Sequence, residues 1–397
     1  MGSSVASRGE RRLVGLMSGT SCDGVDAVVC ALSGTHGVEG VIRARLLVHR
    51  HQAYEPAFSE RLRVVGDARA PELARLHVEL GRRFGAAAAG ALAAAELGPD
   101  DVLAVASPGH TAVHLPPDGD DPGATLALGD GDVTAEASGC LVVCDMRARD
   151  RAAGGQGAPL VPYADACLLR DPSATRAALN LGGIANVTLV PPAGPPVAFD
   201  AGPANMLLDG ALRRATGGAL RFDEGGALGL RGTVDEAWVR GALAADAYLT
   251  LPPPKSTGRE RYGEAFLEAH WHALSRLSVE DLAATLAAHA VDAVLLGLER
   301  WAPSRPDSLV VSGGGAANAC LMTRLAARLA PVQVSSSDDA LGVPAGAREA
   351  LAFALLADAT LAGAAGNVPS VTGAARGVRL GKLCLPARAG LQLPGMD

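Results

Sequence analysis

The sequence predicts an α/β fold made of two related domains, and three observations support this. Its 397 residues are 49% hydrophobic and 19% charged, which is typical of a globular protein and sufficient for two compact cores. Segments with strand-like and helix-like patterns alternate along the chain. Two strands joined by a glycine-containing turn occur near residue 19 and again near residue 182, which favours a duplicated α/β unit over a single parallel sheet.

Each half contributes predicted elements in a similar order. In the first half, strands are predicted over residues 13–17, 25–32, 102–106 and 141–145. A helix over residues 71–97 is predicted from the helical spacing of Leu73, Leu76, Leu80 and Phe84. In the second half, strands are predicted over residues 177–181, 185–190 and 309–311, and a helix follows that contains Leu321, Leu325 and Leu329.

Composition excludes several classes of function. The net charge is −7, aromatic residues make up 3% of the chain, and no basic block is present, so a nucleic-acid partner is not expected. Only two residues are lysines, Lys255 and Lys382, and neither stands in the Walker phosphate-loop pattern. The longest apolar stretch, residues 84–95, is shorter than the ~20 residues that span a bilayer, so no membrane partner is expected. Seven cysteines without a C-x-x-C pair, and an N-terminus unlike a signal peptide, favour reduced thiols and a cytoplasmic location.

The first motif that could carry chemistry is the turn between the first two strands. Its glycine, serine and threonine residues would offer backbone N–H groups and hydroxyls to a polyphosphate. Asp23 and Asp26 beside it could hold Mg²⁺, which prefers oxygen ligands. An ordinary polar hairpin turn explains the same residues equally well.

The second motif is Asp200, which leaves the end of an apolar strand immediately before a glycine–proline turn. Carboxylates at such strand ends are where α/β enzymes place general bases. The alternative is that Asp200 caps the helix predicted to start near Asn205.

Two glycine-rich loops follow other predicted strands. Gly313, Gly314 and Gly315 stand between a strand and a helix, where a phosphate or a flat ligand can approach the backbone. The second loop, around Gln156, follows a run of alternating charges over residues 145–151 that could bind an anionic substrate, although a solvated loop is favoured there.

Taken together and in order, the motifs resemble those of the anhydro-N-acetylmuramic acid kinase family. The matching segments read GLMSGTSCDGVDAV, DMRARDRAAGGQGAPLVP, NLGGIANVTLV, FDAGPANMLLD, PKSTGRERY, VSGGGAANACLM and NVPSVTGA. The similarity extends from about Leu13 to Gly381. It implies an actin-like ATPase fold, with two related ribonuclease H-like α/β domains and an interdomain nucleotide cleft. The expected domains are residues 11–145, onto which 371–397 pack back, and residues 146–370.

The resemblance also implies roles for individual residues. Asp200 matches the catalytic aspartate. Mg²⁺ would be held by Asp23 and Asp26. Glu349 matches an acidic substrate contact. Further candidates for substrate binding are Arg147, Arg149 and Gln156, and which arginine meets the lactyl carboxylate of the sugar is open. The residues implied for ATP are Gly19, Thr20, Ser21, Cys22, Asp23, Gly24, Val25, Asp26, Gly182, Gly183, Gly202, Gly313, Gly314, Gly315 and Asn318.

The reaction implied is the hydrolytic opening of 1,6-anhydro-N-acetylmuramic acid, coupled to its phosphorylation by ATP to N-acetylmuramic acid 6-phosphate in peptidoglycan recycling. The partner would thus be a small amino sugar, and a homodimer is an expectation because dimers are common in the family. Two alternatives remain open: a kinase of the same fold acting on an ordinary amino sugar, and a nucleotide-binding regulator without catalysis.

The chain departs from the family pattern at a few positions. Pro108 and His110 stand where the family usually has S-H-G-Q-T, Arg151 replaces a small apolar residue, and Ala204 replaces a glycine. Because histidine titrates near neutral pH, His110 is expected to make activity change between about pH 6 and 7.

Overall fold

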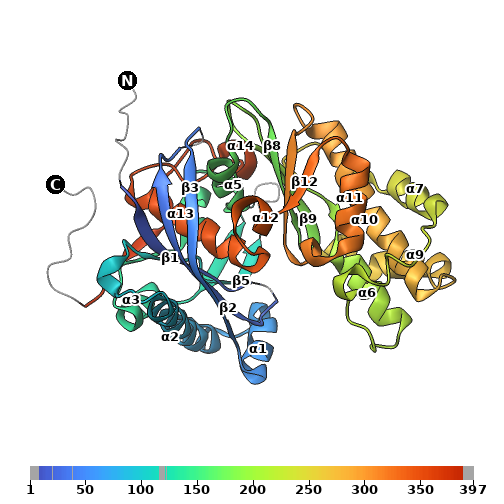
Figure 1. Cartoon of the computed structure of the whole chain (residues 1–397). Helices are drawn as coiled ribbons and strands as arrows, with labels where there is room; N and C mark the ends of the chain where they lie inside the picture. The colour runs from blue at the N-terminus through green and yellow to red at the C-terminus, as the bar shows by residue number, and fades with distance from the viewer. Residues whose placement is uncertain (1–8, 20, 38, 116–120, 122, 388–397) are drawn as a thin grey trace. The chain divides into compact units, whose positions relative to one another are not determined.

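The computed structural model describes residues 9–19, 21–37, 39–115, 121 and 123–387, which form two compact units. Unit 1 comprises Met1–Leu168 and Ala347–Asp397, and unit 2 comprises Leu169–Gly346 (Figure 1). Residues 146–168 and 347–370 therefore belong to unit 1, whereas the sequence-based boundaries place them in the second domain.

Unit 1 is built on a six-stranded sheet. Its strands, in spatial order, are β13 (Lys382–Cys384), β7 (Val142–Cys144), β4 (Val105–Ser107), β1 (Arg11–Met17), β2 (Gly24–Gly34) and β3 (Ile42–Ala53). Strands β1, β2 and β3 are antiparallel neighbours, while β1, β4 and β7 run parallel. The C-terminal strand β13 pairs antiparallel with β7 and so brings the end of the described chain back to unit 1. A separate two-stranded sheet consists of β5 (His110–Leu115) and β6 (Ala124–Leu128).

Unit 2 repeats this arrangement. Its strands, in spatial order, are β10 (Val197–Pro203), β9 (Ile184–Val190), β8 (Arg176–Leu181), β11 (Ser308–Ser312) and β12 (Gln333–Ser336). Again the first three strands in sequence, β8, β9 and β10, pair in antiparallel order. The next two extend the sheet from the other side of β8, where β11 pairs parallel with β8 and β12 pairs parallel with β11. The predicted α/β fold with a duplicated unit is confirmed by this shared strand order.

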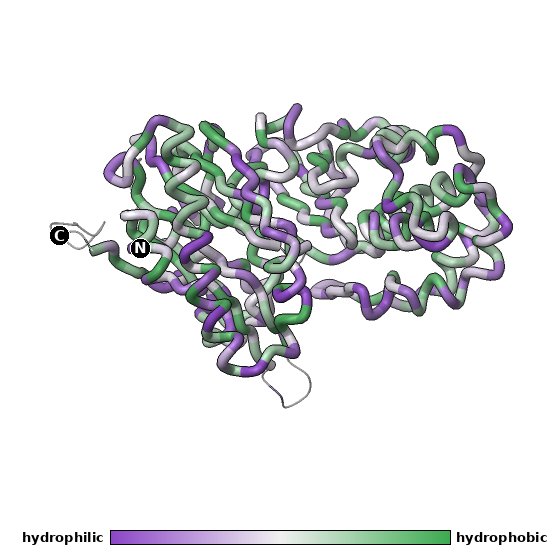
Figure 2. The backbone as a smooth tube through the Cα atoms, turned by 90° about the horizontal axis from the view of Figure 1, so that it is seen from below, coloured by the Kyte–Doolittle hydropathy of each residue, from purple (hydrophilic) through white to green (hydrophobic). Residues whose placement is uncertain are grey.

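Helices cover the sheets in both units. Those of unit 1 are α1 (Pro56–Arg63), α2 (Ala70–Ala94), α3 (Gly131–Ser138), α4 (Met146–Ala152), α5 (Val161–Leu169), α13 (Arg348–Leu361) and α14 (Pro369–Thr372). Those of unit 2 are α6 (Asn205–Ala215), α7 (Glu236–Ala245), α8 (Arg259–Tyr262), α9 (Glu264–Leu274), α10 (Val279–Trp301), α11 (Ala319–Leu329) and α12 (Ser337–Leu341). Hydrophilic and hydrophobic residues alternate along the backbone of both units (Figure 2), as expected for elements with one face against a core.

Alternate residues of β1 face two different helices. Val14 and Leu16 belong to the core that includes Leu80 and Phe84 of α2. The opposite face packs so closely against α13 that a Cβ at Gly15 would lie 2.0 Å from the backbone oxygen of Ala350. The membership of α13 in unit 1 follows from this packing, which sequence periodicity does not reveal.

One helix of unit 2 lies at the centre of its packing. Within the described residues, α10 is the single helix long and apolar enough to cross a membrane, but 83% of its apolar stretch is buried inside the protein. Ala290, Val291 and Val294 of α10 share a core with the sheet and α11. The helix is therefore a core element of unit 2.

A buried ion pair fastens α13 to β1. Asp358 of α13 accepts hydrogen bonds from Arg11 Nε at 2.9 Å and Arg11 Nη2 at 2.8 Å, and His36 Nε2 lies 2.8 Å away. Burial alone would raise the pKa of Asp358, but the hydrogen bonds of His36 and Arg11 outweigh it and lower the pKa. The carboxylate is thus ionised and fully partnered in the folded unit.

Replacing Asp358 by Asn is expected to destabilise unit 1 by about 3–5 kcal/mol, because it leaves the Arg11 guanidinium buried without its counter-charge. Chemical denaturation of the variant would measure this loss. Glu60→Gln, which removes an exposed pair with Arg63, is the matched control and should cost less than about 1 kcal/mol. Equal effects of the two substitutions would contradict this role of the buried pair.

Candidate active site

The turn between β1 and β2 is an ordered hairpin. Cys22 adopts a left-handed backbone conformation with φ 54°, and its N–H donates to Gly19 O at 3.1 Å. Ser21 Oγ donates to Asp23 Oδ1 at 2.6 Å, and both residues are exposed. A Cβ at Gly19 would make ordinary van der Waals contacts, 3.7 Å from Ser21 Oγ and 3.8 Å from Met17 Cε, so close packing does not itself require glycine here. Thr20, predicted as a nucleotide contact, lies outside the described residues.

His110 supports this hairpin from the interior. Its Nδ1 lies 3.1 Å from Ser18 Oγ, which also lies 2.9 Å from the Tyr54 hydroxyl, and its Nε2 lies 3.9 Å from Cys22 Sγ. Burial lowers the pKa of His110, against an opposing contribution from a hydrogen bond with Ser18. A lowered pKa moves the titration of His110 below its ordinary range, so the change of activity expected between about pH 6 and 7 stays a prediction.

Asp26 lies near the start of β2 and is held by two histidines of β3. His49 Nε2 lies 2.9 Å and His51 Nδ1 lies 3.2 Å from the same oxygen, Asp26 Oδ1. No role for these histidines follows from the sequence patterns above. The available signal for the strand that carries them is the alternation of apolar and basic residues from Ile42 to Leu46.

Two further charged residues of unit 1 interact with each other electrostatically. Burial raises the pKa of Glu349, at the start of α13, and the charge of Asp26 raises it further, whereas Arg147 opposes the shift. Burial lowers the pKa of Arg147, and Glu349 opposes that change. Arg147 Nη1 also donates to Gly157 O at 2.9 Å, which fixes the guanidinium beside the glycine loop. These charges place Glu349 in the same electrostatic environment as Asp26 and Arg147.

Asp150 connects that glycine loop to the segment before and within α14. Its carboxylate is buried and accepts from Gly157 N at 2.8 Å, Asn367 Nδ2 at 2.7 Å and Thr372 Oγ1 at 2.7 Å. Gln156 donates its backbone N–H to Thr372 O at 2.8 Å. Two of the resembling motifs, far apart in sequence, are therefore parts of one hydrogen-bonded structure. Arg149, by contrast, is exposed.

The central residue of unit 2 is Asp200, in β10. Thr257 N donates to its Oδ2 at 2.9 Å, and Asn186 Nδ2 donates to its Oδ1. Burial raises the pKa of Asp200, while the Thr257 and Asn186 hydrogen bonds and the charge of Lys255 counteract part of the increase. The side chain is thus a fixed carboxylate with more affinity for a proton than an ordinary aspartate, as a general base requires.

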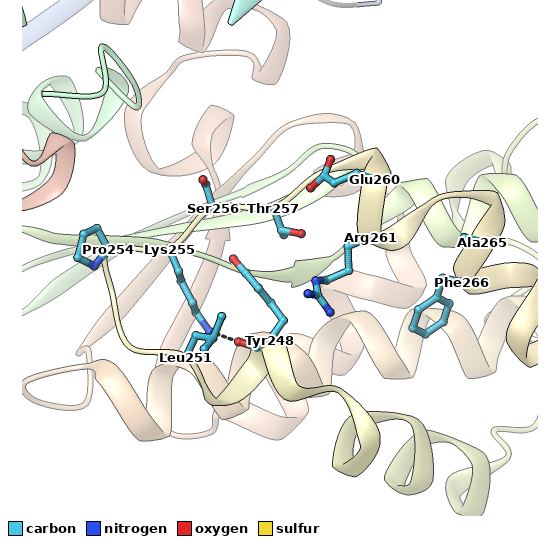
Figure 3. Close-up of a pocket in the computed structure, with 10 residues that line it drawn as sticks. All are labelled: Tyr248, Leu251, Pro254, Lys255, Ser256, Thr257, Glu260, Arg261, Ala265 and Phe266. Carbon is cyan, nitrogen blue, oxygen red and sulfur yellow. Dashed lines mark hydrogen bonds between the residues drawn. The ribbon is translucent and has the colours of Figure 1, made fainter. Parts of the chain in front are cut away.

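The loop around Lys255 borders Asp200 and a pocket of about 740 Å³. Lys255 O accepts from Asp200 N at 3.2 Å, and Lys255 Nζ donates to Tyr248 O at 3.2 Å. Figure 3 shows the Tyr248 ring between the Lys255 and Arg261 side chains, and both cations lie over that ring. The pocket is lined by Tyr248, Leu251, Pro254, Lys255, Ser256, Thr257, Glu260, Arg261, Ala265 and Phe266.

The glycine loop after β11 lies against the β8–β9 turn. Gly313 has φ 78°, and a Cβ there would lie 2.5 Å from Asn180 Oδ1, so the fold itself requires glycine. Gly314 is different, because a Cβ would make an ordinary van der Waals contact with Asn205 Nδ2 at 3.8 Å, and a Cβ at Gly182 would do the same with Asn180 Nδ2 at 3.6 Å. Close packing therefore does not itself require glycine at these two positions.

Local structure accounts for three other predicted nucleotide residues. Gly202 follows a β-bulge in β10 and has φ 149°. A Cβ there would lie only 3.0 Å from the Cβ of Ala293, which is a tight contact. Asn318 is the N-cap of α11, where its Oδ1 accepts from Leu321 N at 3.1 Å. A Cβ at Gly183 would lie 3.0 Å from Met206 Cε.

The structure thus gathers the predicted residues into two groups, each within one unit. Unit 1 brings together the hairpin from Gly19 to Asp26, Glu349 and Arg147. In unit 2, Asp200 is joined to Asn186 and the Lys255 loop, and the glycine loop after β11 lies against the β8–β9 turn. Within the described ranges, no group of three or more histidine, cysteine or acidic residues is arranged to hold a metal ion.

Replacing Lys255 by Met is expected to raise the pKa of Asp200, because it removes a positive charge that favours the ionised carboxylate. An NMR titration of ¹³C-labelled aspartate carboxyls would follow Asp200, with Asp200→Asn used to assign the signal. Lys382→Met, at the other lysine of the chain, should leave that signal unchanged. An unmoved or lowered Asp200 pKa in Lys255→Met would contradict the electrostatic description.

Comparison with known proteins identifies the family. The family model described as anhydro-N-acetylmuramic acid kinase matches residues 11–386. The anhydro-N-acetylmuramic acid kinase of Streptomyces coelicolor is 43% identical over 390 residues, with 96% of each chain covered. That of Gloeobacter violaceus is 40% identical over 378 residues, covering 93% of this chain and 97% of its own. The chain therefore belongs to the anhydro-N-acetylmuramic acid kinase family.

Proposed function

We propose that this chain opens 1,6-anhydro-N-acetylmuramic acid with water and phosphorylates it from ATP, producing N-acetylmuramic acid 6-phosphate and ADP. Family membership supports the substrate and the reaction. The observation that carries the mechanism is Asp200, a partly buried carboxylate with a raised pKa, held by Thr257 and Asn186. The same residue is the catalytic aspartate implied by sequence resemblance.

Asp200 would act as the general base. It takes a proton from a water whose oxygen bonds to C1 of the sugar, and the bond from C1 to the bridging oxygen O6 breaks. That O6 then bonds to the γ-phosphorus of ATP, and ADP leaves. The proton on Asp200 returns to solvent, so one water and one ATP are consumed per product. A general base contributes typically ~10²–10⁴-fold to such a step.

The β1–β2 hairpin would hold the phosphates of ATP. Its support comes from the exposed Ser21 hydroxyl and Asp23 carboxylate that follow Gly19 in the turn. Asp23 and Asp26 have the oxygen donors that Mg²⁺ prefers, and a nucleotide-bound Mg²⁺ usually needs few protein carboxylates because waters and phosphates supply its other ligands. When bound, Mg²⁺ neutralises charge on the transferring phosphoryl group. In unit 2, the glycine turns at Gly182 and Gly314 would contact other parts of the nucleotide, as the sequence resemblance implies.

The sugar would be recognised through charge. Arg147 is the proposed partner of its lactyl carboxylate, since a guanidinium fixed by Gly157 O is suited to binding a carboxylate. Arg149 and Gln156 would contribute from the same loop. Glu349, whose pKa is raised by burial, would accept a hydrogen bond from a sugar hydroxyl.

The wider assignment follows from this chemistry. The proposed substrate is released when peptidoglycan is turned over, so the enzyme would serve peptidoglycan recycling. A cytoplasmic location would give it access to ATP. Its partner would be the amino sugar, without nucleic acid or membrane, and a homodimer is the proposed assembly.

The direct test is sugar-dependent ADP release from MgATP. Turnover is expected with 1,6-anhydro-N-acetylmuramic acid and not with N-acetylmuramic acid or N-acetylglucosamine. Asp200→Asn should lower turnover by about 10²–10⁴-fold while keeping ATP binding, because the substitution removes the base and little else. Asp171→Asn, on the surface of unit 2, is the control with unchanged turnover.

Two outcomes would contradict the proposal. Turnover on an open amino sugar would indicate a different kinase of the same fold. ATP binding without turnover on any of these sugars would instead favour a regulator that has lost catalysis.

A further inference from the structure

We propose that His49 and His51 are positioning residues for Asp26, fixing its Oδ1 so that Oδ2 is directed to nucleotide-bound Mg²⁺. The inference rests on the proposed function, because that assigns Asp26 to the metal. It concerns two residues of β3 that no motif in the sequence indicates.

Strand register places both imidazoles beside the carboxylate. Strands β2 and β3 are antiparallel, and Asp26 is directly opposite His51. His49 is two residues from His51, so it lies on the same face of the sheet. The distances from Asp26 Oδ1 are 2.9 Å to His49 Nε2 and 3.2 Å to His51 Nδ1. An ionised carboxylate is only an acceptor, so each imidazole donates an N–H.

Gly24 provides the room that His51 needs. A Cβ at this position would lie 2.6 Å and 2.7 Å from imidazole atoms of His51, and 2.4 Å from Gln52 O. These separations are shorter than side chains tolerate, so any larger residue would displace the His51 ring or the strand. A glycine of the phosphate hairpin is thereby linked to the position of His51.

The imidazoles act on Asp26 from outside the metal's own ligand set. Neither imidazole is proposed as a ligand of the Mg²⁺. Instead, His49 Nε2 and His51 Nδ1 are both directed to Asp26 Oδ1. Outer partners orient ligating carboxylates in metal sites in the same way. Substitution of such partners typically costs ~10–100-fold in metal affinity.

Asp26 needs this restraint because another acid is close to it. The charge of Asp26 acts on Glu349, and like charges repel. Without hydrogen bonds to Oδ1, the Asp26 side chain would be free to rotate away from Glu349. Two donors on one oxygen oppose that rotation and keep the other oxygen in a single direction.

Calorimetric titration of ADP at a series of Mg²⁺ concentrations tests the proposal without sugar and without turnover. The variants are His49→Val and His51→Val, singly and together, since valine suits a strand and donates no hydrogen bond. The double variant is expected to need about 10–100-fold more Mg²⁺ for the same enhancement of ADP binding. Its affinity for ADP without Mg²⁺ should match the wild type, and His49→Gln, which keeps an N–H donor, should recover part of the loss.

The control is His272→Val on α9, an exposed histidine next to Arg276. It should leave both ADP affinities unchanged. A double variant with the wild-type Mg²⁺ requirement would overturn the proposal, as would an equal loss of ADP affinity with and without Mg²⁺, which denotes a structural role. Neither result depends on the sugar, so a wrong substrate assignment would be detected separately by the ADP-release assay.

Discussion

The proposed reaction depends on holding the Asp200 carboxylate in place while most of its water is removed. Burial of Asp200 is costly for the charged form, and two donors from separate segments, Thr257 and Asn186, offset that cost and set its orientation. Strand β10 is at the edge of its sheet, and its Asp200 N–H donates to the backbone oxygen of Lys255. This hydrogen bond holds the Lys255 loop against β10, where the Thr257 N–H can reach the Asp200 carboxylate. A carboxylate held in this way has a fixed orientation and a raised pKa, whereas an aspartate in water has neither.

The duplicated fold explains why polar pairs occur at corresponding places. In unit 2, Asn186 is the third residue of β9 and is directly opposite Asp200 of β10. In unit 1, Asp26 is the third residue of β2 and is directly opposite His51 of β3. The same strand order thus presents an acid with a cross-strand hydrogen-bond partner in each unit. In one case the acid lies on the second strand and in the other on the third, so equivalent positions have acquired different chemistry.

Much of the fold could be predicted from sequence, because apolar strands next to glycine turns are local signals. The hairpins at β1–β2 and β8–β9, the long helix α2 and the start of α6 at Asn205 are confirmed. The sequence analysis does not predict strand β3, because the alternation from Ile42 to Leu46 is short and residues 49–52 are all polar, so His49 and His51 are not singled out either. The place of α13 in unit 1 and the contacts of Asp150 are set by tertiary packing between distant segments, which no local pattern reports.

The central claim is that one enzyme adds water at C1 and phosphate at O6. The most direct test is to run the reaction in ¹⁸O-labelled water, under conditions that control anomeric exchange, and to weigh the N-acetylmuramic acid 6-phosphate formed. The account predicts one labelled oxygen at C1 in each product molecule, because the water activated by Asp200 becomes the anomeric hydroxyl. Product that forms without the label would contradict it, since the ring would then have opened without attack by water.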